Sequence, residues 1–179
     1  MGQRTLTFAF LMPDPDDHWV NRLTASVSKH PLCHVELFFE TINLCFSIMW
    51  GECAAFRFKN LSNPNYRLVS IAVSVKEYDA CLEFCSSVAR NSIAFDERGM
   101  WRTWVACPMC ESPSMLRGST FCSKIITEAL QFAAIPEARS LHASRTTPSS
   151  LYERMRFSPR LVCGSVPFKR NALMVHSQL

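Results

Sequence analysis

Of the nine cysteines, Cys122 has the sequence context expected of a nucleophile. It lies in the first turn of a helix predicted over residues 121–134, which Ser119 or Thr120 would cap. Unpaired backbone N–H groups at a helix start favour a thiolate over a thiol, and they can stabilise an oxyanion that forms beside the sulfur. The pattern therefore indicates an activated thiol. The alternative is a cysteine that is buried on an apolar helix face.

His34 is the candidate general base for this thiol. It stands at the beginning of a strand predicted over residues 33–40, where Val35, Leu37 and Phe39 share one face. A strand fixes the position of an imidazole, which must come within hydrogen-bond reach of the thiol. The alternative is a half-buried histidine at a sheet edge. The other four histidines lie in predicted helix, loop or tail positions: His18, His30, His142 and His176.

The hydrophobic pattern predicts an α+β fold around these two residues. Strands are expected over residues 5–12, 33–40, 44–50, 54–58 and 67–75. Helices are expected over residues 77–89 and 121–134, from Thr147-Pro148 onward, and after Asp16 or Asp17 with a buried stripe of Trp19, Leu23 and Val27. Residues 91–117 give no clear pattern. We expect an antiparallel sheet of five or six strands packed against the helix that carries Cys122.

Three segments resemble the circularly permuted NlpC-type branch of papain-like cysteine hydrolases. They are the strand with His34 at its start, the Cys-Ser-x-hydrophobic helix from Cys122, and the Thr-Pro-Ser-x-Leu element from Thr147 to Leu151. The strand and helix at 67–89 also fit the segment between the histidine and the cysteine. The branch includes bacterial amidase-like proteins, predicted enzymes of large DNA viruses and LRAT-like lipid acyltransferases. In it the histidine strand precedes the cysteine helix, and no cofactor or metal is needed.

The resemblance also implies a third, polar residue on the strand after the histidine strand, where it would orient the imidazole. Ser47 is the polar side chain of that strand besides the Cys45 thiol, and Glu52 follows just beyond. Glu36 shares a strand face with His34, but a spacing of two residues, about 6.6 Å, is an awkward reach. We therefore expect Ser47 in this role, with Glu52, Glu36 or a water molecule as alternatives.

Cys107-Pro108-Met109-Cys110 is a competing motif, since a CxxC pair can be half of a zinc site or a redox pair. A redox pair needs a helix at its first cysteine, and the sequence that follows is loop-like. Zinc would need two more ligands from scattered residues, and no second pair is present. The candidates are Cys81, Cys85, His142 and Cys163. We interpret Cys107 and Cys110 as small apolar thiols near the cleft.

Composition is consistent with one domain over residues 1–179, with a core at about 5–155 and an extension at 156–179. The 48% hydrophobic and 19% charged residues exclude wholesale disorder, and a net charge of +4 is too small to indicate nucleic-acid binding. An odd number of cysteines without a signal peptide predicts free thiols and a cytoplasmic location. A basic cluster interleaved with aromatic residues permits transient contact with an anionic membrane. Its basic members are Arg154, Arg156, Arg160, Lys169 and Arg170.

The sequence therefore predicts a thiol hydrolase or acyltransferase with Cys122, His34 and Ser47 as its catalytic residues. The thiolate would attack a peptide, amide or lipid acyl carbon and form an acyl-thioester, which water or another nucleophile resolves. Two alternatives remain: an LRAT-like lipid acyltransferase or phospholipase, and a non-catalytic binding module that zinc could staple through Cys107 and Cys110.

Overall fold

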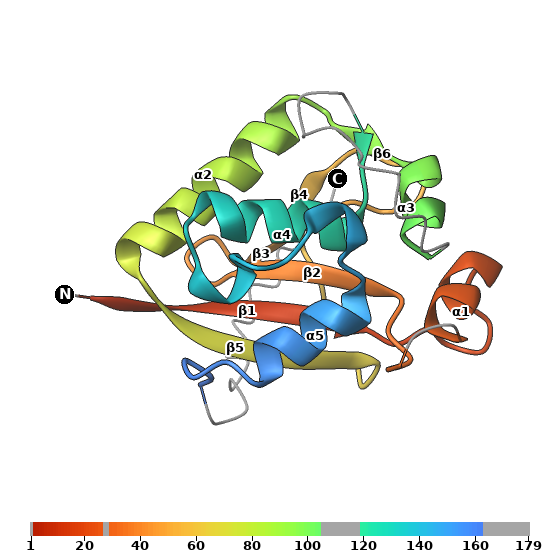
Figure 1. The fold of residues 1–179 in the computed structure, drawn as a ribbon, viewed down its shortest axis with the longest axis horizontal. Helices are drawn as coiled ribbons and strands as arrows, with labels where there is room; N and C mark the ends of the chain where they lie inside the picture. Colours follow the sequence, from red (N-terminus) through yellow and green to blue (C-terminus); the bar gives the residue numbers. More distant parts are fainter. Residues whose placement is uncertain (1, 27–28, 105–118, 163–179) are drawn as a thin grey trace, which may run out of the picture.

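The computed structural model describes residues 2–26, 29–104 and 119–162, and within these ranges the fold is α+β. Its main sheet has five strands in the order β4-β3-β2-β1-β5, with every neighbouring pair antiparallel (Figure 1). The strands are β1 (Gln3–Leu11), β2 (His34–Phe39), β3 (Leu44–Ser47), β4 (Ala55–Arg57) and β5 (Tyr66–Ser74). The predicted sheet class is confirmed.

The two faces of the sheet differ in the size of the core that covers them. On β1 the alternating residues Leu6, Phe8 and Phe10 are fully buried and join the main hydrophobic core. Their partners on the neighbouring strand β2 are Phe39, Leu37 and Val35, which share that face. The opposite face carries a smaller cluster with Ala9, Cys45 and Leu61 at its centre, and His34 and Glu36 alternate toward this side.

Three helices cover the face with the main core: α2 (Val75–Arg90), α4 (Cys122–Phe132) and α5 (Pro148–Arg156). In Figure 1, α4 (turquoise) and α5 (blue) lie over the strands, and α4 begins at the same end of the sheet as β2. The fold thus brings the first residues of β2 and of α4 together.

The helix predicted after Thr147-Pro148 is confirmed as α5, and it packs beside α4. Thr147 caps it by accepting a hydrogen bond from the backbone N–H of Ser150 at 3.1 Å, and Pro148 takes the first helical position.

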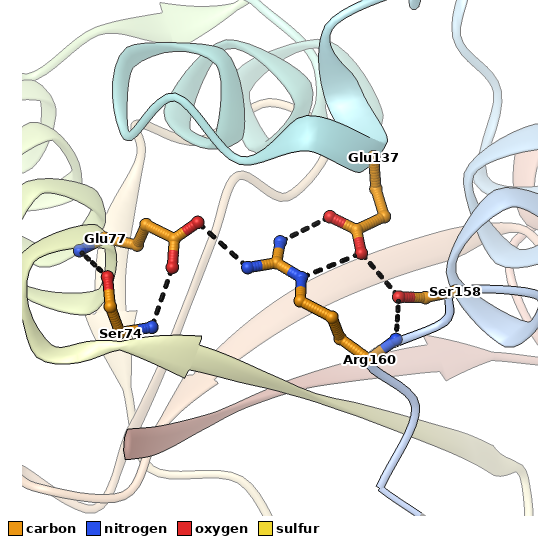
Figure 2. A network of polar contacts seen from close by, with 5 residues as sticks. All are labelled: Ser74, Glu77, Glu137, Ser158 and Arg160. Atoms are coloured by element: carbon orange, nitrogen blue, oxygen red, sulfur yellow. Dashed lines mark hydrogen bonds and ion pairs between the residues drawn. The ribbon is translucent and has the colours of Figure 1, made fainter. Parts of the chain in front are cut away.

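The first part of the predicted extension at 156–179 lies against the sheet. Its residues 160–162 pair with the free edge of β5, where Ala72 donates to the carbonyl of Arg160 and Val162 donates to the carbonyl of Ser70. Figure 2 shows the Arg160 guanidinium between two carboxylates, Glu77 of α2 and Glu137. The chain therefore packs against the sheet edge as far as Val162, although Leu161 and Val162 are exposed.

The prediction for α1 (Trp19–Ser26) was wrong about its buried face. Trp19 and Leu23 are 54% and 38% exposed, whereas Val20, Thr24 and Ala25 are buried. Trp19 and Leu23 are four residues apart, and so are Val20 and Thr24, which form the neighbouring row on the helix. In so short a helix the spacing alone does not determine which of the two rows faces the protein. Val27 lies outside the described residues.

The region 91–117, which gave no clear pattern, contributes a strand and a helix. These are β6 (Ala94–Phe95), which pairs in parallel with β7 (Ser119–Thr120), and α3 (Glu97–Trp104). None of the helices in the described ranges has the length and apolar character needed to cross a membrane.

Candidate active site

Cys122 is the first residue of α4, but the predicted side-chain cap is absent. The N-cap position is Phe121, whose backbone is extended, and no side chain accepts a hydrogen bond from the first turn there. Ser119 and Thr120 instead form β7, one residue too early to cap the helix. The first-turn N–H groups of α4 are therefore left for the sulfur or for an oxyanion beside it.

Cys122 and His34, which are far apart in the sequence, interact in the structure. Burial alone would raise the pKa of the Cys122 thiol, but the His34 imidazole and the backbone N–H groups of Val35 and Ser123 outweigh burial and lower it. Burial would likewise lower the pKa of His34, but Cys122 and Glu36 raise it to about 9. Both directions favour a thiolate–imidazolium pair over a neutral thiol and imidazole.

Glu36 forms an ion pair with the His34 imidazole. Its Oε1 lies 3.5 Å from Nε2 of His34, an ion-pair distance slightly longer than a hydrogen bond. The carboxylate is 1% exposed and also lies 3.4 Å from Nζ of Lys59, and it accepts a hydrogen bond from the hydroxyl of Tyr66 at 3.3 Å. Burial alone would raise the pKa of Glu36, but His34 and Lys59 lower it, so the carboxyl group is ionised.

Ser47, the residue that the sequence favoured for this role, is buried at the end of β3. Its carbonyl accepts a hydrogen bond from Arg57, and the side chains that raise the pKa of His34 are Cys122 and Glu36. Glu52 is half exposed and paired with Arg57. Among the described residues, Glu36 is therefore the carboxylate at ion-pair distance from the imidazole, although Nε2 of His34 makes no hydrogen bond to it.

The two other described thiols near the site, Cys33 and Cys45, have a raised pKa, opposite to that of Cys122. Burial, followed by the negative charges of Cys122 and Asp17, raises the pKa of Cys33 to about 12. Burial and the nearby Glu36 raise the pKa of Cys45 as well. Cys122 is thus set apart from its neighbours by its contact with His34, because burial acts in the same direction on all three thiols.

The segment 146–153 links the helix that carries Cys122 to the loop that leads to His34. The Ser123 hydroxyl, next to Cys122, donates to the carbonyl of Thr146 at 2.6 Å in a buried setting. Three residues later, the Ser149 hydroxyl accepts a hydrogen bond from the backbone N–H of His30 at 3.1 Å. The His30 ring also packs edge-on against Tyr152 and pairs with Glu153. Through these contacts the Cys-Ser and Thr-Pro-Ser elements connect the start of α4 to the loop before β2.

The structure offers no support for a metal site within the described ranges, where no group of three or more His, Cys, Asp or Glu side chains could hold an ion. Cys107, Cys110 and Cys163 lie outside these ranges. The six described cysteines are free thiols: Cys33, Cys45, Cys53, Cys81, Cys85 and Cys122.

The predicted basic cluster is largely engaged in internal contacts. Arg160 pairs with two carboxylates, Arg154 donates to the carbonyl of Glu137, and Arg156 lies 3.6 Å from Glu153. Phe157 beside them is 70% exposed. The remaining members of the cluster, Lys169 and Arg170, lie outside the described residues.

Comparison of the sequence with models of known protein families and with curated proteins found no match. The assignment of a function therefore depends on the chemistry of the site itself.

Proposed function

We propose that the protein is a cysteine hydrolase or acyltransferase with Cys122 as nucleophile, His34 as general acid and base, and Glu36 as the residue that orients His34. The proposal includes a circularly permuted papain-like fold of the NlpC type. The observation that carries it is the buried chain of alternating charge from Cys122 through His34 to Glu36. A lowered thiol pKa at a helix start with a buried base is the arrangement that nucleophilic catalysis needs.

The reaction would proceed in two halves. The Cys122 thiolate attacks the carbonyl carbon of an amide or ester, and N–H groups at the start of α4 stabilise the oxyanion. The His34 imidazolium then gives its proton to the leaving amine or alcohol, and an acyl-thioester remains on the sulfur. In the second half, neutral His34 takes a proton from water or an acceptor nucleophile, which attacks the thioester and releases Cys122 as a thiolate.

Two features of the site favour catalysis over a binding module. Burial alone would raise the pKa of the Cys122 thiol, yet this pKa is lowered, and the buried carboxylate serves the imidazole as well as Lys59. A structural core gains more from apolar residues than from a buried ion pair of this kind. Attack by water on the thioester gives hydrolysis, and attack by a second substrate gives acyl transfer.

Competitive labelling with iodoacetamide at pH 6, read by mass spectrometry of the tryptic peptides, tests the proposal. We expect Cys122 to react first, ahead of Cys53, which is exposed and so serves as a matched accessible thiol. His34→Ala should slow labelling of Cys122 and leave Cys53 unchanged, because only Cys122 depends on the imidazolium. Faster labelling of Cys53 than of Cys122 at pH 6, together with zinc in the purified protein, would instead support the binding module.

A panel of peptide amides, isopeptides and lipid esters then tests turnover. Cys122→Ala and His34→Ala should each abolish it, and the double variant should be no worse than either single variant because the two groups act as a unit. Residual turnover in Cys122→Ala that equals wild type would remove Cys122 from the mechanism.

A further inference from the structure

A cavity of about 410 Å³ lies between the end of α2 and the beginning of α4. Its volume falls within the range of about 300–1,000 Å³ that is usual for small-molecule sites. Apolar side chains from α2, α4 and the segment between α2 and β6 form most of its wall, and the polar lining residues are Ser87, Asn91 and Thr120. The apolar lining residues are Phe84, Val88, Ile93 and Ile125.

Thr120 provides an unpartnered polar group in this wall. The residue is 2% exposed, and its Oγ1 has no hydrogen-bond partner. Its backbone is fixed, because its carbonyl accepts a hydrogen bond from Asp96 at 2.6 Å and it pairs with Phe95 across β6 and β7. A buried hydroxyl without a partner costs free energy, so a ligand that supplies a polar atom would recover it.

The cavity lies next to the nucleophile along the chain. Thr120 and Cys122 flank Phe121, whose backbone is extended with φ −134° and ψ 165°. Side chains two residues apart in an extended segment point to the same side, with Cα atoms about 7 Å apart. The Thr120 side chain in the cavity wall therefore leaves the chain on the same side as the reactive sulfur.

We propose that this cavity binds the apolar chain of the acyl group that Cys122 accepts, and that the Thr120 hydroxyl donates a hydrogen bond to the oxygen at the carbonyl end of that chain. The inference rests on the proposed function and names its substrate class: acyl groups with an apolar chain of medium length, for which octanoyl is the probe. An acetyl group and a hexadecanoyl chain serve as the short and the long comparison.

Binding is tested separately from turnover, in a protein with Cys122→Ala. We expect octanoate to bind by ligand-detected NMR, and Ser87→Phe to block it, because Ser87 is an exposed position at the cavity wall. Ser86→Phe, one residue away on α2 and outside the lining, is the matched control and should bind as the parent does. Thr120→Val should weaken binding about three- to tenfold while leaving thermal stability unchanged or higher, since it removes an unpaired buried hydroxyl.

Turnover is then measured with 4-nitrophenyl acetate, octanoate and hexadecanoate. We expect kcat/KM to be highest for octanoate, and Ser87→Phe to lower the octanoate-to-acetate ratio while Ser86→Phe does not. Ester turnover without octanoate binding, or equal loss of binding in both phenylalanine variants, overturns this inference and leaves the proposed function standing. If octanoate binds but Cys122 reacts with no ester, the proposed function is contradicted. The ligand in the cavity is then not an acyl group that Cys122 accepts.

Discussion

Replacing Glu36 with glutamine should lower the upper apparent pKa of the Cys122–His34 pair. In the wild-type protein the pKa of His34 is raised to about 9, so the imidazolium persists through neutral pH and loses its proton as the pH rises through that value. Glu36→Gln keeps the shape of the side chain and removes the negative charge 3.5 Å from Nε2. The imidazolium then loses one of the two groups that stabilise it.

The size of the effect follows from the distance. Two unit charges at this separation interact by about 5 kcal/mol at an effective dielectric constant of about 20. One pKa unit corresponds to about 1.36 kcal/mol, so the ceiling is roughly three and a half units. Lys59 lies at 3.4 Å from the same oxygen and screens the carboxylate, which reduces the effect. We expect a fall of about one to three units, the usual range for an opposite charge at this distance.

The assay is an NMR titration of the histidine ring protons between pH 5 and 10, with His34 assigned by its absence in His34→Gln. Lys59→Met is a control of opposite sign: it removes a positive charge near the site and should raise the same apparent pKa. Ser47→Ala should leave it unchanged if Glu36 is the partner of the imidazole. An upper pKa that stays near 9 in Glu36→Gln, or that falls as far in Ser47→Ala, would refute the role given to Glu36.

Two further predictions concern the contacts that hold the site in place. Ser123→Ala should cost about 1–2 kcal/mol in urea unfolding, because it leaves the buried carbonyl of Thr146 unpaired, and it should also slow labelling of Cys122 at pH 6. Ser123→Thr should restore both, whereas a loss of stability with unchanged labelling would limit Ser123 to a structural role. Arg160→Met should cost about 1–3 kcal/mol at pH 7, a value discounted because the Arg160 side chain is 26% exposed. Burial alone would raise the pKa of Glu137, but Arg160 lowers it to about 2. The difference in free energy of unfolding between variant and wild type should therefore shrink as the pH falls from about 4.5 toward 2. A difference that does not change with pH would contradict this.

Much of the scaffold could be predicted from the sequence, because its strands are patterned for one buried face. Val35, Leu37 and Phe39 alternate with polar or half-buried residues, and such alternation specifies both the strand and its orientation. The helix at Pro148 was predictable for another reason, since Thr147 and Pro148 are a capping residue and a first-turn residue with local causes. In both cases the residues that determine the element are close to one another in the sequence.

The third member of the site could not be predicted, because its setting comes from distant parts of the chain. Glu36 is accommodated opposite the small side chain of Ala9, and it is balanced by Lys59 and Tyr66, which come from elements far along the sequence. Spacing along one strand carries none of this information. The N-cap was missed for a related reason, since pairing of Thr120 with Phe95 sets where the helix can begin.

The charges of the site form one alternating series, and its arrangement limits how each member can ionise. The Cys122 sulfur, His34 and Glu36 are all at least nine-tenths buried, so none of them could carry a charge alone without a large desolvation cost. Each is instead balanced by the next, and the series ends at Lys59, whose side chain is 25% exposed and reaches water. Removal of Glu36 therefore leaves the imidazolium with the thiolate as its remaining counter-charge, and removal of Lys59 leaves Glu36 with His34 alone. If the charges are coupled, Glu36→Gln should lower the pKa of His34 and Lys59→Met should raise it. If these residues were independent core contacts, the two substitutions would change stability without shifting the pKa of His34 in these opposite directions.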